Sequence, residues 1–135
     1  MARKGTPDGG LREIAERAYV GGADFTLVAY TNTPDSLGPG TVAADLVQPT
    51  VANGYAPIAL DGTWSVSANG VVTYNHGPTV NPQWIATGAW SAPVTGTAII
   101  FGSRCVHFRD FDDIGSTWIA ANGRKLAVNI QQVLS

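Results

Sequence analysis

Short runs of apolar and β-branched residues, divided by turn dipeptides, restrict the fold of this chain more than any other feature. The pairs Asp61-Gly62, Asn69-Gly70 and Asn122-Gly123 are typical of hairpin turns. Within 135 residues such spacing leaves room for one domain with roughly eight or nine short strands. We therefore expect a mainly β chain, an antiparallel β-sandwich or jelly roll with a short N-terminal α-helix.

The strands can be assigned along the chain from residue 25 onward. We expect segment 31–40, rich in Pro and Gly, to form turns, and segment 41–46 to be either a short helix or a loop. The run 96–101 is apolar throughout, which indicates a strand buried on both faces. The expected strands are 25–30, 54–59, 63–67, 71–75, 84–90, 96–101, 105–111, 117–120 and 125–130.

The register of one hairpin follows from where its apolar side chains must go. A three-residue loop, 68–70, places Trp64 opposite Tyr74 and Val66 opposite Val72. A two-residue loop would pair the same two residues with polar side chains. Because strand register follows burial, we predict the three-residue loop.

Two further hairpins are expected on the same grounds. A loop of Leu60-Asp61-Gly62 would bring Ile58 opposite Trp64. The Asn122-Gly123 turn would join the short strand before it to 125–130, whose apolar side chains alternate onto one face.

The N-terminal region differs from the rest of the chain. Its apolar residues recur at helical spacing, so we predict a helix over about residues 10–20; these residues are Leu11, Ile14, Ala15, Ala18 and Tyr19. We expect residues 1–10 to form an arm and residues 11–135 to form a single helix-plus-β-sandwich domain.

The distribution of charge is unusual. No Lys or Arg occurs from Ala18 to Ser103, a stretch of 86 residues, and only 13% of the whole chain is charged. Soluble monomers hold about a quarter of their residues as charge. We therefore expect neighbouring subunits to cover much of this surface, as in a large assembly.

The same composition argues against several other classes. Net charge is −2 and the basic residues form no stripe, which speaks against nucleic-acid binding. No apolar run approaches the ~20 residues of a membrane span, and the first residues do not resemble a secretion signal, so we expect a protein kept in a cytoplasm. Cys105 is the single cysteine, so no intrachain disulfide can form.

One cluster resembles an active site. On a strand, Cys105 and His107 would point the same way, about 7 Å apart, but a catalytic pair needs the base aimed at the nucleophile. Asp110, Asp112 and Asp113 could bind a hard cation, although the spacing of an EF-hand is absent. We expect a half-buried strand followed by an acidic turn, with no catalytic residues, no metal and no cofactor. His76, in a turn sequence, is expected to be a loop histidine.

Aromatic and basic side chains are the candidates for contact with partners. Trp84, Trp90 and Trp118 could stack on sugar rings, or they could anchor subunit interfaces, where Trp is enriched. Arg3 and Lys4 are expected to dock the arm into an acidic groove of a partner, since two charges add little affinity for nucleic acid. Arg12 and Arg17, on the outer face of the predicted helix, complete the predicted interface set.

The order of motifs resembles a group of small structural proteins of tailed bacteriophages. The resemblance rests on LREIAERAYVGGADFTLVAYTNT, VQPTVANGYAPIALDGTWSVSANGVVTY, GAWSAPVTGTAIIFGSRCVHFRDF and AANGRKLAVNIQQVL, which together cover most of residues 11–134. It implies a virion component assembled in the host cytoplasm, without enzymatic activity.

Within that group the first choice is a capsid decoration (cement) protein. It would be a homo-oligomer, with a trimer favoured, bound between subunits of the major capsid protein. The alternative is a tail, baseplate or fibre-associated protein, with host-glycan binding through exposed Trp residues.

Overall fold

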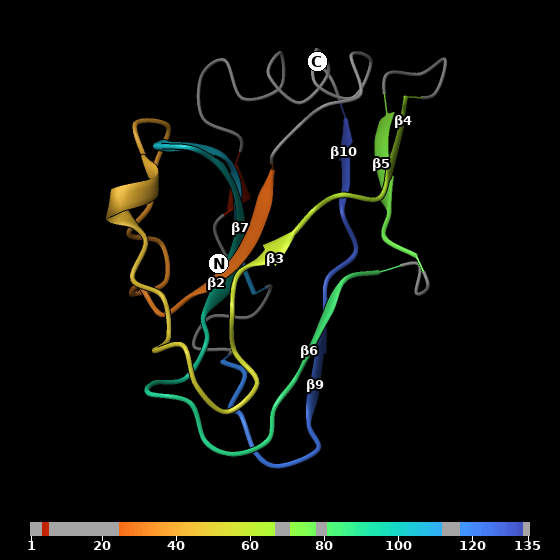
Figure 1. Cartoon of the computed structure of the whole chain (residues 1–135). Coiled ribbons are helices and arrows are strands. Elements are labelled where there is room, and N and C mark those ends of the chain that lie inside the picture. Colours follow the sequence, from red (N-terminus) through yellow and green to blue (C-terminus); the bar gives the residue numbers. More distant parts are fainter. Residues whose placement is uncertain (1–3, 6–24, 67–70, 78–80, 112–116, 134–135) are drawn as a thin grey trace.

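The computed structural model of this chain describes residues 4–5, 25–66, 71–77, 81–111 and 117–133. Within these ranges antiparallel strands dominate and form three sheets (Figure 1), so the prediction of a mainly β chain is confirmed. The largest sheet contains, in spatial order, β1 (Lys4–Gly5), β8 (Arg104–Asp110), β7 (Gly96–Phe101), β2 (Thr26–Tyr30) and β3 (Ile58–Ala59).

Two smaller sheets and a short helix accompany it. The three-stranded sheet has the order β10 (Gln131–Val133), β5 (Val71–Asn75) and β4 (Thr63–Val66). A two-stranded ribbon pairs β6 (Gln83–Ile85) with β9 (Lys125–Ala127). Segment 41–46 contains a 3-10 helix, η1 (Ala43–Asp45), so the short helix is the correct one of the two expectations for this segment.

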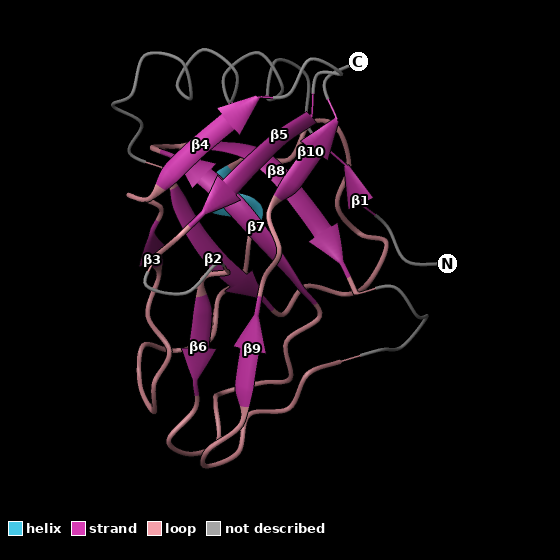
Figure 2. Ribbon diagram, turned by 90° about the vertical axis from the view of Figure 1, so that its right-hand side faces the viewer, coloured by secondary structure: helices cyan, strands magenta, loops and turns pink. Residues whose placement is uncertain are grey.

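Both faces of the five-stranded sheet are covered. The three-stranded sheet and the β6–β9 ribbon lie across one face (Figure 2) and share one core cluster with it. On the other face, Leu37 and Leu46 pack against Val28, Tyr30 and Phe108. Strands β2 and β7 are buried from both sides, which is why their sequences are continuous apolar runs and were recognisable as strands.

The hairpin of β4 and β5 has the predicted register. Trp64 pairs with Tyr74 and Val66 pairs with Val72. The centroids of the Trp64 and Tyr74 rings lie 4.7 Å apart, so the cross-strand pair is in contact. Burial of this face was sufficient to predict the pairing.

The predicted pairing of Ile58 with Trp64 is wrong. Strand β3 pairs with β2 instead, with Ile58 opposite Leu27, and the backbone N–H of Leu60 donates to the carbonyl of Phe25. The chain changes sheets between Leu60 and β4. Ile58 and Trp64 still pack against the same core cluster, but they do so across the core rather than across a hairpin.

Four of the predicted strands are shorter than expected. Segment 54–59 contributes only Ile58–Ala59, segment 84–90 contributes a strand only as far as Ile85, and segment 125–130 contributes only Lys125–Ala127. In segment 117–120, Trp118 makes an isolated bridge to Val94. The Asn122-Gly123 turn is present, but it leads into β9, whose partner is β6 rather than the segment before the turn. In these segments, aromatic side chains packed on the core take the place of the expected strand-to-strand hydrogen bonds.

The predicted helix over residues 10–20 lies outside the described residues, as does most of the predicted arm. The arm's two described residues, Lys4 and Gly5, pair with Arg109 and Phe108 at the edge of the sheet. These two residues therefore lie on this chain's own sheet, which corrects the expectation that another protein holds the whole arm. A short pairing of this kind also covers an edge strand that would otherwise be open at that point.

Candidate functional site

A β-bulge separates the residues of the candidate active-site cluster. On β8, His107 pairs with Ile99 while Cys105 pairs with Ile100, so Val106 is the extra residue between them. Cys105 consequently packs on one face of the sheet, in the cluster with Val28 and Tyr30. His107 faces the opposite side, so the prediction that the two side chains point the same way is wrong.

The thiol of Cys105 has the surroundings of a structural cysteine. It is 4% exposed, and burial raises its pKa to about 11. The Sγ–H group donates to the carbonyl oxygen of His107, at 3.5 Å. A nucleophilic cysteine needs a stabilised thiolate, and this environment stabilises the neutral thiol instead.

Asp110 is a buried anchor for the loop that follows β2. The carboxylate is 2% exposed. It accepts a hydrogen bond from the hydroxyl of Tyr30 at 2.5 Å and another from the backbone N–H of Asp35 at 2.8 Å. Asp35 has a φ of 64°, a left-handed conformation that is uncommon outside glycine, so the Asp110 bond holds a specific turn geometry.

The candidate cation site of Asp110, Asp112 and Asp113 lies partly outside the described residues. Asp112 and Asp113 lie outside them, and among the residues described there is no group of three His, Cys, Asp or Glu side chains that could hold a metal ion. His76 is a loop histidine, as expected, and its Nδ1 lies 2.6 Å from the hydroxyl of Tyr74. That hydroxyl also accepts a hydrogen bond from the backbone N–H of Gly62, so the His76 contact belongs to a structural network.

A small cavity lies between the five-stranded sheet and the segment after β9. Its polar lining includes Thr97, His107, Arg109 and Asn129, among aliphatic side chains. The cavity measures about 40 Å³. Since one water needs at least ~10–15 Å³, this volume suits a few waters rather than an organic substrate.

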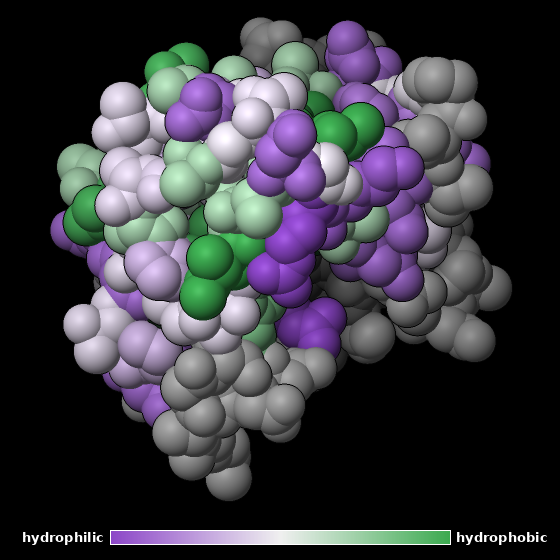
Figure 3. Space-filling view, turned by 90° about the horizontal axis from the view of Figure 1, so that it is seen from below, coloured by the Kyte–Doolittle hydropathy of each residue, from purple (hydrophilic) through white to green (hydrophobic). Residues whose placement is uncertain are grey.

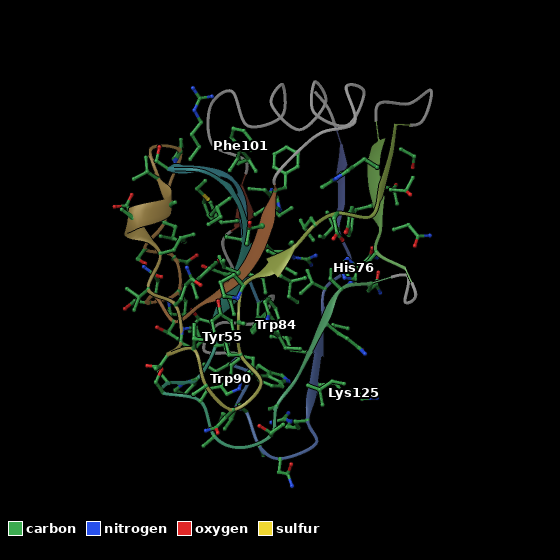
Figure 4. The ribbon with its side chains drawn as sticks, viewed as in Figure 1. Tyr55, His76, Trp84, Trp90, Phe101 and Lys125 are labelled. Carbon is green, nitrogen blue, oxygen red and sulfur yellow. The ribbon has the colours of Figure 1, made fainter. Side chains whose placement is uncertain are left out.

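Four aromatic side chains contact one another in a row, which we call the aromatic ladder: Tyr55, Trp84, Trp90 and Trp118. Tyr55 lies 5.6 Å from Trp84 and 5.0 Å from Trp90, and Trp90 lies 5.0 Å from Trp118, between ring centroids. Figure 4 shows Tyr55, Trp84 and Trp90 gathered beneath β2 and β3. The rings meet at angles of 32° to 86° rather than in one plane, so they do not present a flat platform for a sugar.

The burial of these rings revises their predicted role. Trp84 was predicted at an interface, but it is 3% exposed and lies in the core, where its Nε1–H donates to the carbonyl of Ala56. Trp90 and Trp118 are partly buried, and the Nε1–H of Trp90 donates to the carbonyl of Asn53. Of the four rings of this ladder, Trp90 and Trp118 are therefore the two that offer surface to a partner.

Hydrogen bonds join the loops around this ladder into one unit, which we call the loop end: residues 48–57, 85–93 and 117–124. The side-chain amide of Asn53 donates to the carbonyl of Ala89 at 2.7 Å, and the backbone N–H of Thr50 donates to the hydroxyl of Ser91 at 2.9 Å. The backbone N–H of Gly123 donates to the carbonyl of Ala86 at 2.7 Å. These bonds connect all three segments, so the loop end presents a fixed shape.

The surface of the loop end is apolar at several points and nearly free of charge. Val51 is 68% exposed, Ile119 is 57% exposed and Ile85 is 47% exposed. Arg124 is the one charged residue among residues 48–57, 85–93 and 117–124. Figure 3, which faces this end, shows green and pale residues over much of the surface.

Sequence patterns did not single out these exposed aliphatic residues. Ile85 lies in a run that suggested one buried face, and Val51 and Ile119 carry no periodic signal. The charge-poor stretch of residues 18–103 was the available indication, and it contains Val51 and Ile85 but not Ile119. Of the predicted basic contacts, Arg3, Arg12 and Arg17 lie outside the described residues, and only the backbone of Lys4 is described.

Within the described parts of the chain, no helix combines the length and apolar character that crossing a membrane requires. A scan against protein-family models, a search of curated proteins and a search of solved structures each found no match.

Proposed function

We propose that this chain is a structural protein of a bacteriophage virion, a capsid decoration protein that binds between subunits of the major capsid protein. Its body would be a β-sandwich or jelly roll, and it would act as a homo-oligomer, with a trimer favoured. The role is cohesive and non-enzymatic. The sequence resemblance supports the assignment to a bacteriophage virion, and the loop end supports the role in capsid decoration.

The observation that carries the proposal is the exposed, rigid and charge-poor loop end. Exposed apolar side chains are normal singly, but here three of them lie on one hydrogen-bonded unit. Depletion of charge is the compositional mark of the central part of a protein–protein interface. A surface that is already ordered loses little conformational entropy on binding.

Cohesion would come from repetition of a modest contact. A specific interface buries about 800 Å² per partner. Each decoration oligomer contacts several capsid subunits at once, so the individual contacts add as avidity. The assembled shell would then resist the outward pressure of packaged DNA better than an undecorated shell.

The test compares particles with and without this chain. Particles lacking it are expected to release DNA at a lower temperature, as measured by fluorescence of an intercalating dye during heating, and added purified protein is expected to restore the higher temperature. The double variant Val51→Asp, Ile119→Asp should fold, since both side chains are exposed, but bind particles at least about tenfold more weakly. Thr63→Asp, at an exposed position on β4, is the matched control. Equal binding by all three proteins would refute the role of the loop end.

The arm supplies a second test of the same proposal. Deletion of residues 1–10 removes β1, which contributes only two residues to the sheet edge. The body is expected to fold while incorporation into particles falls. Unchanged incorporation would remove the arm from the docking mechanism.

The alternative is a tail, baseplate or fibre-associated protein that binds a host glycan. The observation in its favour is the partly exposed pair Trp90 and Trp118, with the Arg124 guanidinium 5.5 Å from the Trp118 ring centroid. In that case host polysaccharide would change the Trp fluorescence, and Trp118→Ala would abolish the change. A capsid decoration protein would show neither effect.

A further inference from the structure

Two surfaces on different sides of the molecule pair charge with exposed aliphatic side chains. The first, which we call the basic ribbon surface, consists of Ile85, Ile119, Arg124 and Lys125. The second, which we call the acidic loop surface, consists of Val42, Asp45 and Val47. All seven side chains are exposed.

The basic ribbon surface is held in place by defined contacts. Ile85 lies directly across from Lys125 in the β6–β9 register. The guanidinium of Arg124 donates to the carbonyl of Ile119 at 2.8 Å and lies 5.5 Å from the ring centroid of Trp118. Figure 4 shows Lys125 directed away from the body of the molecule. Two positive charges thus stand beside two aliphatic side chains that are about half exposed.

The acidic loop surface is equally ordered. One carboxylate oxygen of Asp45 accepts a hydrogen bond from the backbone N–H of Val42 at 2.9 Å. The backbone of Val47 exchanges hydrogen bonds with Thr31 and with the side chain of Asn32. Val42 is 45% exposed and Val47 is 58% exposed, so one exposed valine is bonded through its backbone to the carboxylate and another follows Asp45 by two residues.

The two surfaces complement each other but cannot meet within one molecule. In Figure 1 the η1 helix lies at the left edge and β9 at the lower right, and in Figure 2 η1 lies behind the strands while β9 lies in front. We infer that the basic ribbon surface of one copy binds the acidic loop surface of a second copy, head to tail. A contact between two different surfaces of identical chains is heterologous, and it closes into a ring when the rotation between copies allows it.

Other charges near the two surfaces limit where the contact can form. Arg104 pairs with Val42 through a backbone bridge, so it lies at the rim of the acidic loop surface. Nucleic acid fits the basic ribbon surface poorly, because two positive charges flanked by isoleucines lack the basic stripe that phosphate binding needs. A second copy supplies both the carboxylate and the apolar surface.

This inference deepens the proposed structural role by naming the contact between copies. The test is the sedimentation of the purified full chain, at about 50 mM and about 500 mM salt, since exposed charge pairs weaken as the Debye length shortens. The wild type is expected to associate at low salt and to dissociate partly at high salt. A wild type that remains monomeric at low salt would overturn the inference.

Charge reversal locates the contact. The variants Arg124→Glu, Lys125→Glu and, separately, Asp45→Lys should each weaken self-association about tenfold, and all three substitutions combined in one chain should restore it. Asp61→Lys, at an exposed acid outside both surfaces, is the matched control and should sediment as the wild type. Because Asp45→Lys removes a cap, Asp45→Asn serves as a second variant that keeps the acceptor oxygen and loses only the charge.

Reversed variants that still associate as the wild type does, or a combined variant that folds by circular dichroism but stays monomeric, would overturn the inference. These outcomes are separable from the proposed function. Particle binding by a protein that does not self-associate would leave the decoration role intact and remove only the head-to-tail contact.

Discussion

The bond between Tyr30 and Asp110 should contribute more to stability than any other side-chain hydrogen bond described here. Tyr30 is fully buried, Asp110 is 2% exposed, and the two oxygens lie 2.5 Å apart. Tyr30→Phe removes the donor and keeps the ring, so the buried carboxylate retains only its bond from the N–H of Asp35. Hydrogen bonds to charged groups contribute roughly 1.5–3 kcal/mol.

We therefore expect Tyr30→Phe to lower the free energy of unfolding by about 2 kcal/mol. For a domain of this size the melting temperature should fall by about 8 °C, as measured by calorimetry or by circular dichroism. Tyr55→Phe is the matched control, since that buried hydroxyl bonds only neutral groups, the Gln48 side chain and the Ala29 backbone. It should cost about 1 kcal/mol. A loss from Tyr30→Phe equal to or below that of Tyr55→Phe would refute the reasoning.

Three further outcomes follow from the same packing. Gly96→Ala places a Cβ against the hydroxyl of Tyr30 and the carbonyl of Arg109, both closer than contact distance, so it should destabilise by at least about 2 kcal/mol in urea unfolding; a neutral effect would show that the sheet yields there. The Cys105 thiol, with a pKa raised to about 11 by burial, should resist a thiol reagent at pH 8 until the protein unfolds, and fast labelling of the native state would contradict this burial. Burial also raises the pKa of Tyr55 to about 12. The contribution of this group to the free energy of unfolding should therefore be fully present below pH 10 and should be lost as pH rises from 10 towards 12, because the unfolded state releases its proton first. The absorbance of tyrosinate followed alongside unfolding checks this: ionisation of Tyr55 near pH 10 in the folded protein would disprove it.

Loop rigidity explains why a charge-poor chain can expose aliphatic residues at one end. The aromatic ladder of Tyr55, Trp84, Trp90 and Trp118 supports the loops from within, and their backbone groups bond one another across segments far apart in sequence. The proposed contact with a capsid subunit and the proposed contact with a second copy share Ile85, Ile119 and Arg124. The acidic loop surface belongs to the second contact alone, so Asp45→Lys separates self-association from binding to particles.

The local pattern of apolar and polar residues was sufficient to predict those strands whose partners are close in sequence or whose two faces are both buried. The register of β4 and β5 followed from placing Trp64 and Val66 on one face, and β2 and β7 were recognisable because both their faces are buried. The stretch without Lys or Arg, residues 18–103, contains four of the five exposed aliphatic residues, Val42, Val47, Val51 and Ile85, while Ile119 lies beyond it. In each case the relevant force, burial of apolar side chains, acts on the residues that form the pattern.

Tertiary structure alone decided the pairings between distant segments. No local sequence pattern predicts that β3 pairs with β2 rather than with β4, that β9 pairs with β6, or that Lys4 pairs with Arg109 across the sheet edge. The bulge at Val106, which turns Cys105 away from His107, arises from the fit of β8 to β7 and has no signature in the alternation of residues. Hydrophobic burial is non-directional, so it specifies which side chains leave water, while the choice among distant partners depends on how all the sheets fit together around one core.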